Sequence, residues 1–186
     1  MGAERAGEYH VDDLEAALKL AIRHIEGDRV EIVEGVIQQM SPRWGHERPI
    51  ALIRRQLEAR VEELGCVIGS GDIDLPGSSN WFIPDIAVVP FELTENDAGS
   101  LVPSQTLLVV EVTSESNGDT DRLVKRRRYA EYGAPLYLLV DRRERTTMLF
   151  AEPGPLGYTR VSGPYPFGTP IELPEPFGLV LSTEKF

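Results

Sequence analysis

The sequence contains one cysteine, three histidines and no long apolar run. Cys66 alone can form neither an internal disulfide nor a cysteine-based zinc site, so its simplest role is that of a small buried hydrophobe. No stretch approaches the roughly 20 apolar residues of a transmembrane helix, and residues 1–10 contain no apolar signal-peptide segment. We therefore expect a cytoplasmic protein that does not enter a membrane.

Lysine is also scarce, because only three of the 19 basic residues are lysines and the others are arginines. The net charge of −11 argues against a protein that coats nucleic acid, although a local basic patch can still contact it. The 186 residues are enough for one domain with a substantial core. We expect a single domain over residues 1–186, with residues 1–10 flexible.

Two helices and a hairpin are predicted in the first third of the chain. Residues 11–25 have an amphipathic pattern that Asp12 can cap, with Glu15 as its box partner. Residues 29–40 contain two alternating runs around Glu34-Gly35, which predicts a hairpin. Residues 45–65 carry apolar side chains at helical spacing and end at a glycine, as a long helix does.

The middle of the chain has the pattern of a sheet. Strands are predicted within residues 66–76, 81–90 and 106–113. A helix over 119–133 then leads to a second apolar strand at 135–141, and this strand–helix–strand unit favours a parallel pair. The remaining chain predicts short strands joined by Pro/Gly turns. The whole indicates one α/β domain.

Two acids interrupt the apolar strands. Glu111 follows four aliphatic residues, and Asp85 directly follows Pro84 within the preceding strand. An ionised carboxylate is costly to bury alone, and two that converge repel unless a cation lies between them. A hard divalent metal would satisfy both acids. Alternatively, each acid caps a turn or pairs with an arginine.

Lys125 is unusual in a chain that uses arginine for most positive charges. On a helix it shares a stripe with Arg122, Tyr129 and Tyr132. Lysine is a compact ammonium whose pKa responds to its surroundings, and arginine cannot replace it in that role. The alternative is a solvated basic helix face.

Together these segments resemble the Uma2 family of the PD-(D/E)XK, or restriction endonuclease-like, superfamily. The resemblance runs from about residue 10 to near the C-terminus and rests on the order and spacing of several motifs. They are VEIVEGVIQQMSPRWGHE (30–47), PDIAVV (84–89), LLVVEVTSES (107–116), DRLVKRRRYAEYGAPLYLLVD (121–141) and LSTEKF (181–186). The implied fold is α/β: a mixed sheet flanked by helices, with an N-terminal helix and hairpin and a C-terminal β extension.

The resemblance implies a metal site and a catalytic lysine. Asp85 and Glu111 would be the metal ligands, with the backbone carbonyl of Val112 as a third. The ion would be Mg²⁺, with Mn²⁺ as a substitute. Thr113 stands where the superfamily expects its lysine, and Lys125 on the following helix matches the place to which Uma2-like sequences move it.

Glu31 and His46 also match family positions, although the sequence assigns them no role. Glu31, His46 and Tyr129 are secondary candidates, and a lone histidine is more often structural. Arg126, Arg127 and Arg128 lie on different sides of the predicted helix, so at most one or two could contact backbone phosphate. The sequence departs from the family at Ser114-Glu115-Ser116, where Ser-Pro-Ser is usual, and at Val36, where an acid is common.

The implied activity is metal-dependent hydrolysis of DNA, with double-stranded DNA as the expected substrate and a homodimer as the expected assembly. The metal would lower the pKa of a bound water, and Lys125 would stabilise developing charge or help orient and deprotonate that water. A structure-specific or RNA nuclease and a non-catalytic nucleic-acid-binding or interaction domain on the same fold remain open as alternatives.

Overall fold

A six-stranded mixed sheet forms the centre of the fold. The structure is a computed structural model, and it describes residues 13–25, 29–39, 41, 43–95, 100–113 and 119–186. The strands of the sheet, in spatial order, are β10 (Gly157–Pro166), β9 (Thr146–Gly154), β8 (Leu136–Asp141), β7 (Leu108–Val112), β6 (Ile86–Pro90) and β3 (Cys66–Gly69). β7 and β8 are parallel, which confirms the predicted parallel pair, and the other neighbours are antiparallel.

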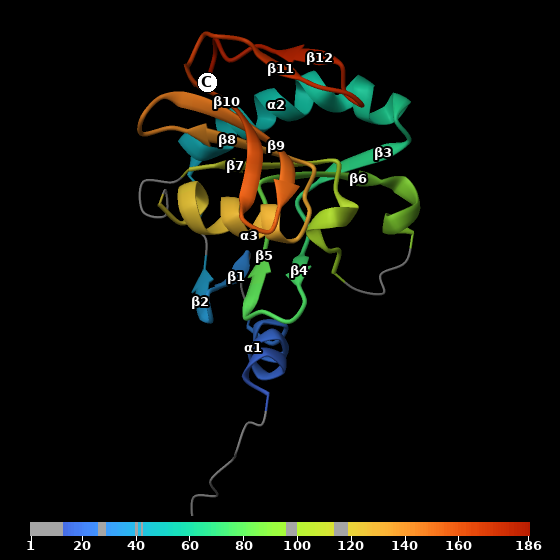
Figure 1. The fold of residues 1–186 in the computed structure, drawn as a ribbon, viewed down its shortest axis with the longest axis vertical. Coiled ribbons are helices and arrows are strands. Elements are labelled where there is room, and N and C mark those ends of the chain that lie inside the picture. The colour runs from blue at the N-terminus through green and yellow to red at the C-terminus, as the bar shows by residue number, and fades with distance from the viewer. Residues whose placement is uncertain (1–12, 26–28, 40, 42, 96–99, 114–118) are drawn as a thin grey trace, which may run out of the picture.

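Two smaller sheets complete the strands. The first is antiparallel, in the order β2 (Val36–Gln39), β1 (Val30–Val33), β5 (Asn80–Phe82) and β4 (Ile73–Leu75). The second pairs β11 (Ile171–Leu173) with β12 (Leu179–Leu181). The hairpin predicted around Glu34-Gly35 is confirmed as β1–β2. In Figure 1 the four-stranded sheet lies below the six-stranded sheet, with the first helix beneath it.

The helices cover both faces of the large sheet. They are α1 (Leu14–Ile22), α2 (Trp44–Glu63), α3 (Arg126–Glu131) with the π-helical turn η3 (Thr120–Lys125) before it, and the short 3-10 helices η1 (Phe91–Thr94) and η2 (Pro103–Gln105). Figure 1 shows α2 and β11–β12 on one face of the sheet and α3 on the other. Among the described residues, no helix combines the length and the apolar character needed to cross a membrane.

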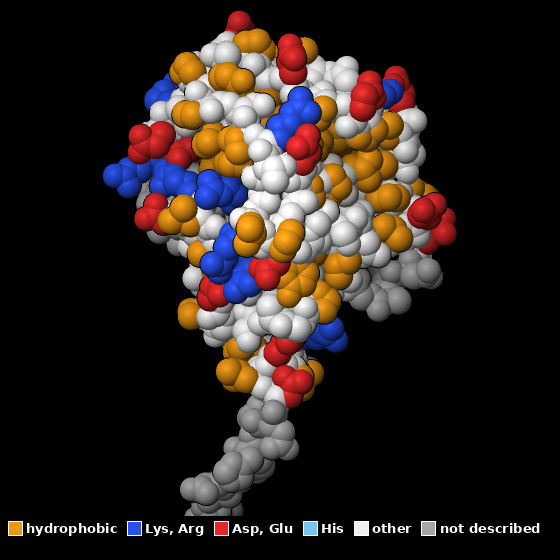
Figure 2. All heavy atoms as spheres, in the orientation of Figure 1, with side chains coloured by type: hydrophobic (Ala, Val, Ile, Leu, Met, Phe, Trp, Pro, Cys, Tyr) orange, Lys and Arg blue, Asp and Glu red, His pale blue; other side chains and the backbone are white. Residues whose placement is uncertain are grey.

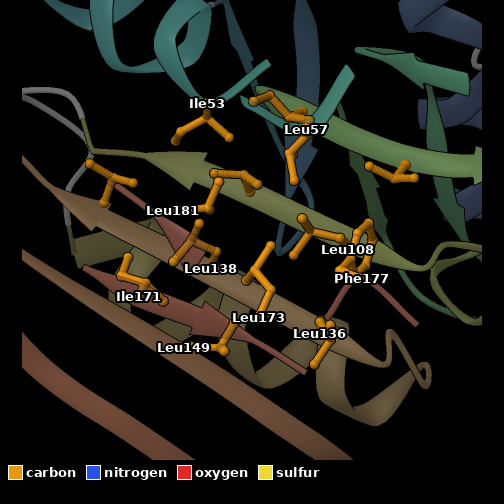
Figure 3. Close-up of a cluster of buried hydrophobic side chains, with 14 of the residues drawn as sticks. Ile53, Leu57, Leu108, Leu136, Leu138, Leu149, Ile171, Leu173, Phe177 and Leu181 are labelled. Atoms are coloured by element: carbon orange, nitrogen blue, oxygen red, sulfur yellow. The ribbon is translucent and has the colours of Figure 1, made fainter. Parts of the chain in front are cut away.

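The main core lies between α2, the large sheet and β11–β12 (Figure 3). Ile53 and Leu57 of α2 point onto Leu108 and Leu138 of the sheet, and Phe177 packs beside them. All five side chains are fully or almost fully buried. Helical spacing on one side and strand alternation on the other therefore supply the two apolar surfaces that the sequence predicts.

Two predicted strands each divide between sheets. The stretch 66–76 forms β3 in the large sheet and β4 in the small one, and the stretch 81–90 forms β5 and β6 in the same way. Pro84 lies in the second break and has no N–H to donate to a ladder, so continuous pairing stops there. The prediction of single strands was wrong at both places.

Other boundaries also differ from the prediction. The helix predicted over 11–25 is α1, and its N-cap is Asp13, whose side chain accepts from the Ala16 N–H at 3.0 Å. The predicted cap, Asp12, lies outside the described residues. The helix predicted over 119–133 begins with a π-helical turn. In the C-terminal part, β9 and β10 are longer than the short strands predicted.

Candidate active site

Asp85 and Glu111 face each other across two neighbouring strands. The antiparallel register of β6 and β7 pairs Ile86 with Val110, so the next position places Asp85 opposite Glu111. Both acids are buried, at 4% and 3% exposure. The Val112 N–H donates to Asp85 Oδ2 at 2.8 Å, which extends the contact between the strands beyond the last pair of the ladder.

Positive groups surround the Asp85 carboxylate. Arg29 Nη1 donates to Oδ1 at 3.2 Å, and His46 Nε2 lies 3.2 Å from Oδ2 without the alignment of a good hydrogen bond. Burial alone would raise the pKa of Asp85, but the contact with His46 and the Val112 N–H outweigh it and hold that pKa below its ordinary value. Burial would lower the pKa of His46, yet the Asp85 carboxylate raises it overall.

Lys125 lies among three other buried acids. Its Nζ is 2.9 Å from Glu31 Oε1, 3.1 Å from Glu111 Oε1 and 3.6 Å from Asp121 Oδ1. Burial would lower the pKa of Lys125, but Glu111, Glu31 and Asp121 together raise it well above its usual value. The lysine is therefore a fixed cation in this arrangement, suited to charge stabilisation rather than to proton abstraction.

Lys125 does not cancel all the negative charge around it. Burial raises the pKa of Glu111 well above its usual value, and repulsion from Asp121, Asp85 and Glu31 adds to this despite the neighbouring ammonium. For Asp121, burial together with the charges of Asp85 and Glu31 raises the pKa to about 7. The cluster of Asp85, Glu111, Glu31 and Asp121, called the acid cluster below, would therefore gain from another cation.

Glu31 and Tyr129 help to hold the opposed acids Asp85 and Glu111 in place. Glu31 Oε1 accepts from the Ile83 N–H at 2.7 Å, which ties β1 to the segment leading into Asp85. The Tyr129 hydroxyl donates to Glu111 Oε1 at 3.0 Å, and its ring packs edge-on against Phe82. Burial raises the pKa of Tyr129 well above its usual value, so the hydroxyl keeps its proton.

The arginines after Lys125 turn away from the acid cluster. Arg128 binds Glu34 through two nitrogens, at 2.7 and 2.8 Å, and also reaches Glu131. Arg126 stacks over the Phe150 ring, 5.2 Å from its centroid, and Arg127 lines the same surface hollow. Figure 2 shows basic side chains over the region of α3 with acidic ones beside them.

Two other arginines approach the site instead. A cavity of about 530 Å³ opens beside Asp85, and Arg29 and Arg54 both line it. Arg54 Nη2 also donates to the Asp85 carbonyl at 3.1 Å. Sequence reasoning missed both arginines and Asp121. A signal existed only for Asp121, whose spacing four residues before Lys125 places both on one side of a helix.

Thr113, which stands where the superfamily expects its lysine, has a structural place at the end of β7. The Thr113 side chain is fully buried, and its Oγ1 accepts from the Arg142 N–H at 3.0 Å. Its N–H continues the parallel ladder to Val140. Glu115 and its two serine neighbours, where the sequence departs from the family, lie outside the described residues.

The donors suit a hard divalent cation. Within the described part of the chain, no group of three or more His, Cys, Asp or Glu is arranged to hold a metal. Two carboxylates and a peptide oxygen form a smaller set, which is typical of Mg²⁺. The N–H and C=O of one strand residue point to the same side, so the Val112 carbonyl faces the Asp85 side of β7. Residues Asp85, Glu111 and Val112 therefore fit such an ion, which would compete with Arg29 and His46 for Asp85.

The six-stranded mixed sheet, flanked by helices and accompanied by two smaller sheets, defines a restriction endonuclease-like fold. The model of the Uma2 family, described as "Putative restriction endonuclease", matches residues 14–184, so the chain belongs to this family. A similar solved structure is that of "a putative nuclease belonging to DUF820" from Anabaena variabilis ATCC 29413. It is 17% identical, with a TM-score of 0.70 over 90% of this chain and 95% of that one. No protein of curated function matches.

Proposed function

We propose that this protein is a metal-dependent endonuclease that hydrolyses DNA phosphodiester bonds. Membership of the Uma2 family supports a nuclease. The observation that carries the finer proposal is the opposition of Asp85 and Glu111 in the β6–β7 register, with Lys125 bonded to Glu111 from the next helix. Two acids at adjoining strand ends and a lysine that reaches one of them are the groups that this hydrolysis needs.

Each residue has a distinct part in the reaction. Asp85, Glu111 and the Val112 carbonyl would hold Mg²⁺ or Mn²⁺. When bound, the ion would polarise the phosphate and lower the pKa of an attacking water. Lys125 stays protonated and stabilises negative charge as it develops on the phosphate. Its raised pKa makes it unsuitable as the base that accepts the water proton.

The route of the substrate follows from the cavity beside Asp85. Arg29 and Arg54 line this cavity, and guanidinium groups bind phosphate oxygens well. Arg29 holds Asp85 in the structure, so a phosphate that draws it away would expose Asp85 to the metal. Binding through these two arginines should weaken as salt rises.

The direct test is cleavage of supercoiled plasmid with Mg²⁺ or Mn²⁺. We expect nicking by the wild type and its loss in Asp85→Asn, Glu111→Gln and Lys125→Met. Glu144→Gln is the matched control, because Glu144 is 64% exposed in an isolated ion pair. Cleavage that survives both acid substitutions would refute this site, and a wild type inactive on DNA and RNA would favour the interaction-domain alternative.

A homodimer is a further part of the proposal. β10 is at one edge of the large sheet, and an edge strand offers unpaired backbone groups. Val161 on this strand is 49% exposed. Sedimentation velocity should show a dimer, and Val161→Lys should weaken it. A wild type that stays monomeric at all concentrations would refute the proposed homodimer.

A further inference from the structure

A second and larger cavity, about 630 Å³, adjoins the cavity beside Asp85, and no residue of the acid cluster lines it. Small residues of the large sheet line one side of it, namely Gly69 of β3 and Ala87 of β6, and Trp81 of the small sheet lines another. A volume of several hundred Å³ with mixed polar and apolar walls is typical of a site for a small organic group.

The cavity shares a sheet face with the acids. Ala87 pairs with Val109 across β6 and β7, so the two side chains lie on one face. Glu111 comes two residues after Val109 and therefore points to that same face. At roughly 3.3 Å per residue, Ala87 lies about 7 Å along the strand from Asp85. A group in the cavity would thus be a near neighbour of a phosphate at Asp85.

Ser70 lies between the large cavity and the cavity beside Asp85. It lines both the large cavity and the cavity beside Asp85, as Asp72 also does. The Ser70 hydroxyl donates to the Pro84 carbonyl at 2.7 Å and accepts from Arg29 Nη2 at 2.8 Å. The wall between the phosphate side and the large cavity is therefore thin and includes Ser70 and Asp72.

The walls suit a flat aromatic ring. Trp81 is only 5% exposed, and the exposed Arg23 lies over its ring, 5.7 Å from the centroid. The planar guanidinium, backed by the indole, is therefore the surface on which a ring could stack. A Cβ added at Gly69 or Gly71 would meet no atom within 4 Å, so both glycines leave open space in the cavity that they line. Bases outside a helix stack on such aromatic and guanidinium planes.

We propose that this cavity binds one unstacked nucleobase of the substrate, beside the phosphate that the acid cluster would cleave. The proposal rests on the proposed nuclease function. It gives the enzyme a preference for nucleotides that are unpaired or easily extruded, because unstacking such a base costs the least. The Asp72 carboxylate on the shared wall supplies an acceptor for a base amino or imino group.

The test measures base binding without cleavage. The chain has two tryptophans, and Trp44→Phe leaves Trp81 as the only one. Trp44 is 90% exposed, so this replacement should not disturb the fold. With EDTA present, thymidine 3′,5′-bisphosphate should change Trp81 emission saturably. The abasic deoxyribose 3′,5′-bisphosphate, which has the same phosphates and no base, should bind about tenfold more weakly or worse.

A cavity-filling variant locates the base. Gly69→Leu should weaken binding of the thymidine compound roughly tenfold by calorimetry and leave that of the abasic compound unchanged. Gly154→Leu is the matched control, since its Cβ meets only the Gly157 carbonyl at 3.5 Å, an ordinary contact on the β9–β10 hairpin. Arg23→Gln should weaken binding of the thymidine compound without filling the cavity.

The outcomes separate this inference from the proposed function. Equal binding of the two compounds, no binding of either, or no effect of Gly69→Leu would overturn the base site, even if the plasmid is cut. Base-dependent binding that Gly69→Leu removes would support the base site, even in a protein that cuts no DNA under any metal condition.

Discussion

Replacing Lys125 by methionine should destabilise the protein strongly. The ammonium is 2% exposed, bonds to Glu31 and Glu111, and is 3.6 Å from Asp121. Removing one partner of a buried ionic group leaves the other charges uncompensated, at a cost of about 3–5 kcal/mol. Methionine keeps much of the volume against the Phe82 ring, so this cost is mainly electrostatic.

Urea denaturation at neutral pH measures the effect. We expect Lys125→Met to lower the free energy of unfolding by about 3–5 kcal/mol, and Lys185→Met, at an exposed position, by less than about 0.5 kcal/mol. Adding Glu31→Gln removes one of the uncompensated acids, so the double variant should recover part of the loss, about 0.5–3 kcal/mol. A loss below about 1 kcal/mol for Lys125→Met would refute the view that it neutralises the acid cluster.

The same variant tests whether the acids bind a metal. A ligand that binds only the folded state stabilises it by RT ln(1 + [L]/Kd). Without Lys125 the acids have lost their main cation, so Mg²⁺ should raise the melting temperature of Lys125→Met more than that of the wild type. The gain should vanish when Glu111→Gln is added. Equal Mg²⁺ effects on all three proteins would show that the ion binds elsewhere.

Three further predictions concern stability. Tyr129→Phe removes the hydroxyl that donates to Glu111 and should cost about 1–3 kcal/mol in urea denaturation. Leu57→Ala, at a fully buried position of α2, should cost about 2–5 kcal/mol. Burial alone would raise the pKa of Asp141, but Arg122 and backbone N–H groups lower it overall. The stability from this pair is therefore complete above the unfolded pKa of about 3.9 and is lost as pH falls through the lower folded pKa. The stability difference between wild type and Arg122→Met should shrink over that acid range, and a constant difference would exclude this linkage.

The pair of acids could be predicted because a carboxylate within an apolar strand is an anomaly that the local sequence shows. Such a carboxylate needs a partner, and Glu111 and Asp85 are acids in two successive apolar strands. Alternation along the strands then fixed the face of each side chain. The β6–β7 register, which places Asp85 opposite Glu111, is consistent with the pairing of the acids and with their shared face. Apolar periodicity likewise predicted α2 and the parallel pair correctly.

The contacts between those acids and their partners could not be worked out from residue patterns, because the partners come from distant segments. Glu31 reaches Lys125 across 94 residues of sequence, and Arg29 reaches Asp85 across 56. The direction of a helical side chain also depends on how the helix packs. Arg126 and Arg128 look like phosphate ligands in sequence, but their nearest partners are Phe150 and Glu34. A run of arginines shows that charge is present, and only tertiary packing decides where it points.

The break at Pro84 explains both the acid site and the adjoining cavity. Trp81 belongs to β5 of the small sheet, whereas Ile86 begins β6 of the large sheet. An unbroken strand would keep Trp81 and Asp85 in one sheet, with both side chains on the same face and no second wall between them. Because the chain changes sheet within four residues, Asp85 meets Glu111 on β7 while Trp81 forms the opposite wall of the cavity. The break at Pro84 therefore separates Asp85 of the acid cluster from Trp81 of the cavity wall along a single short segment.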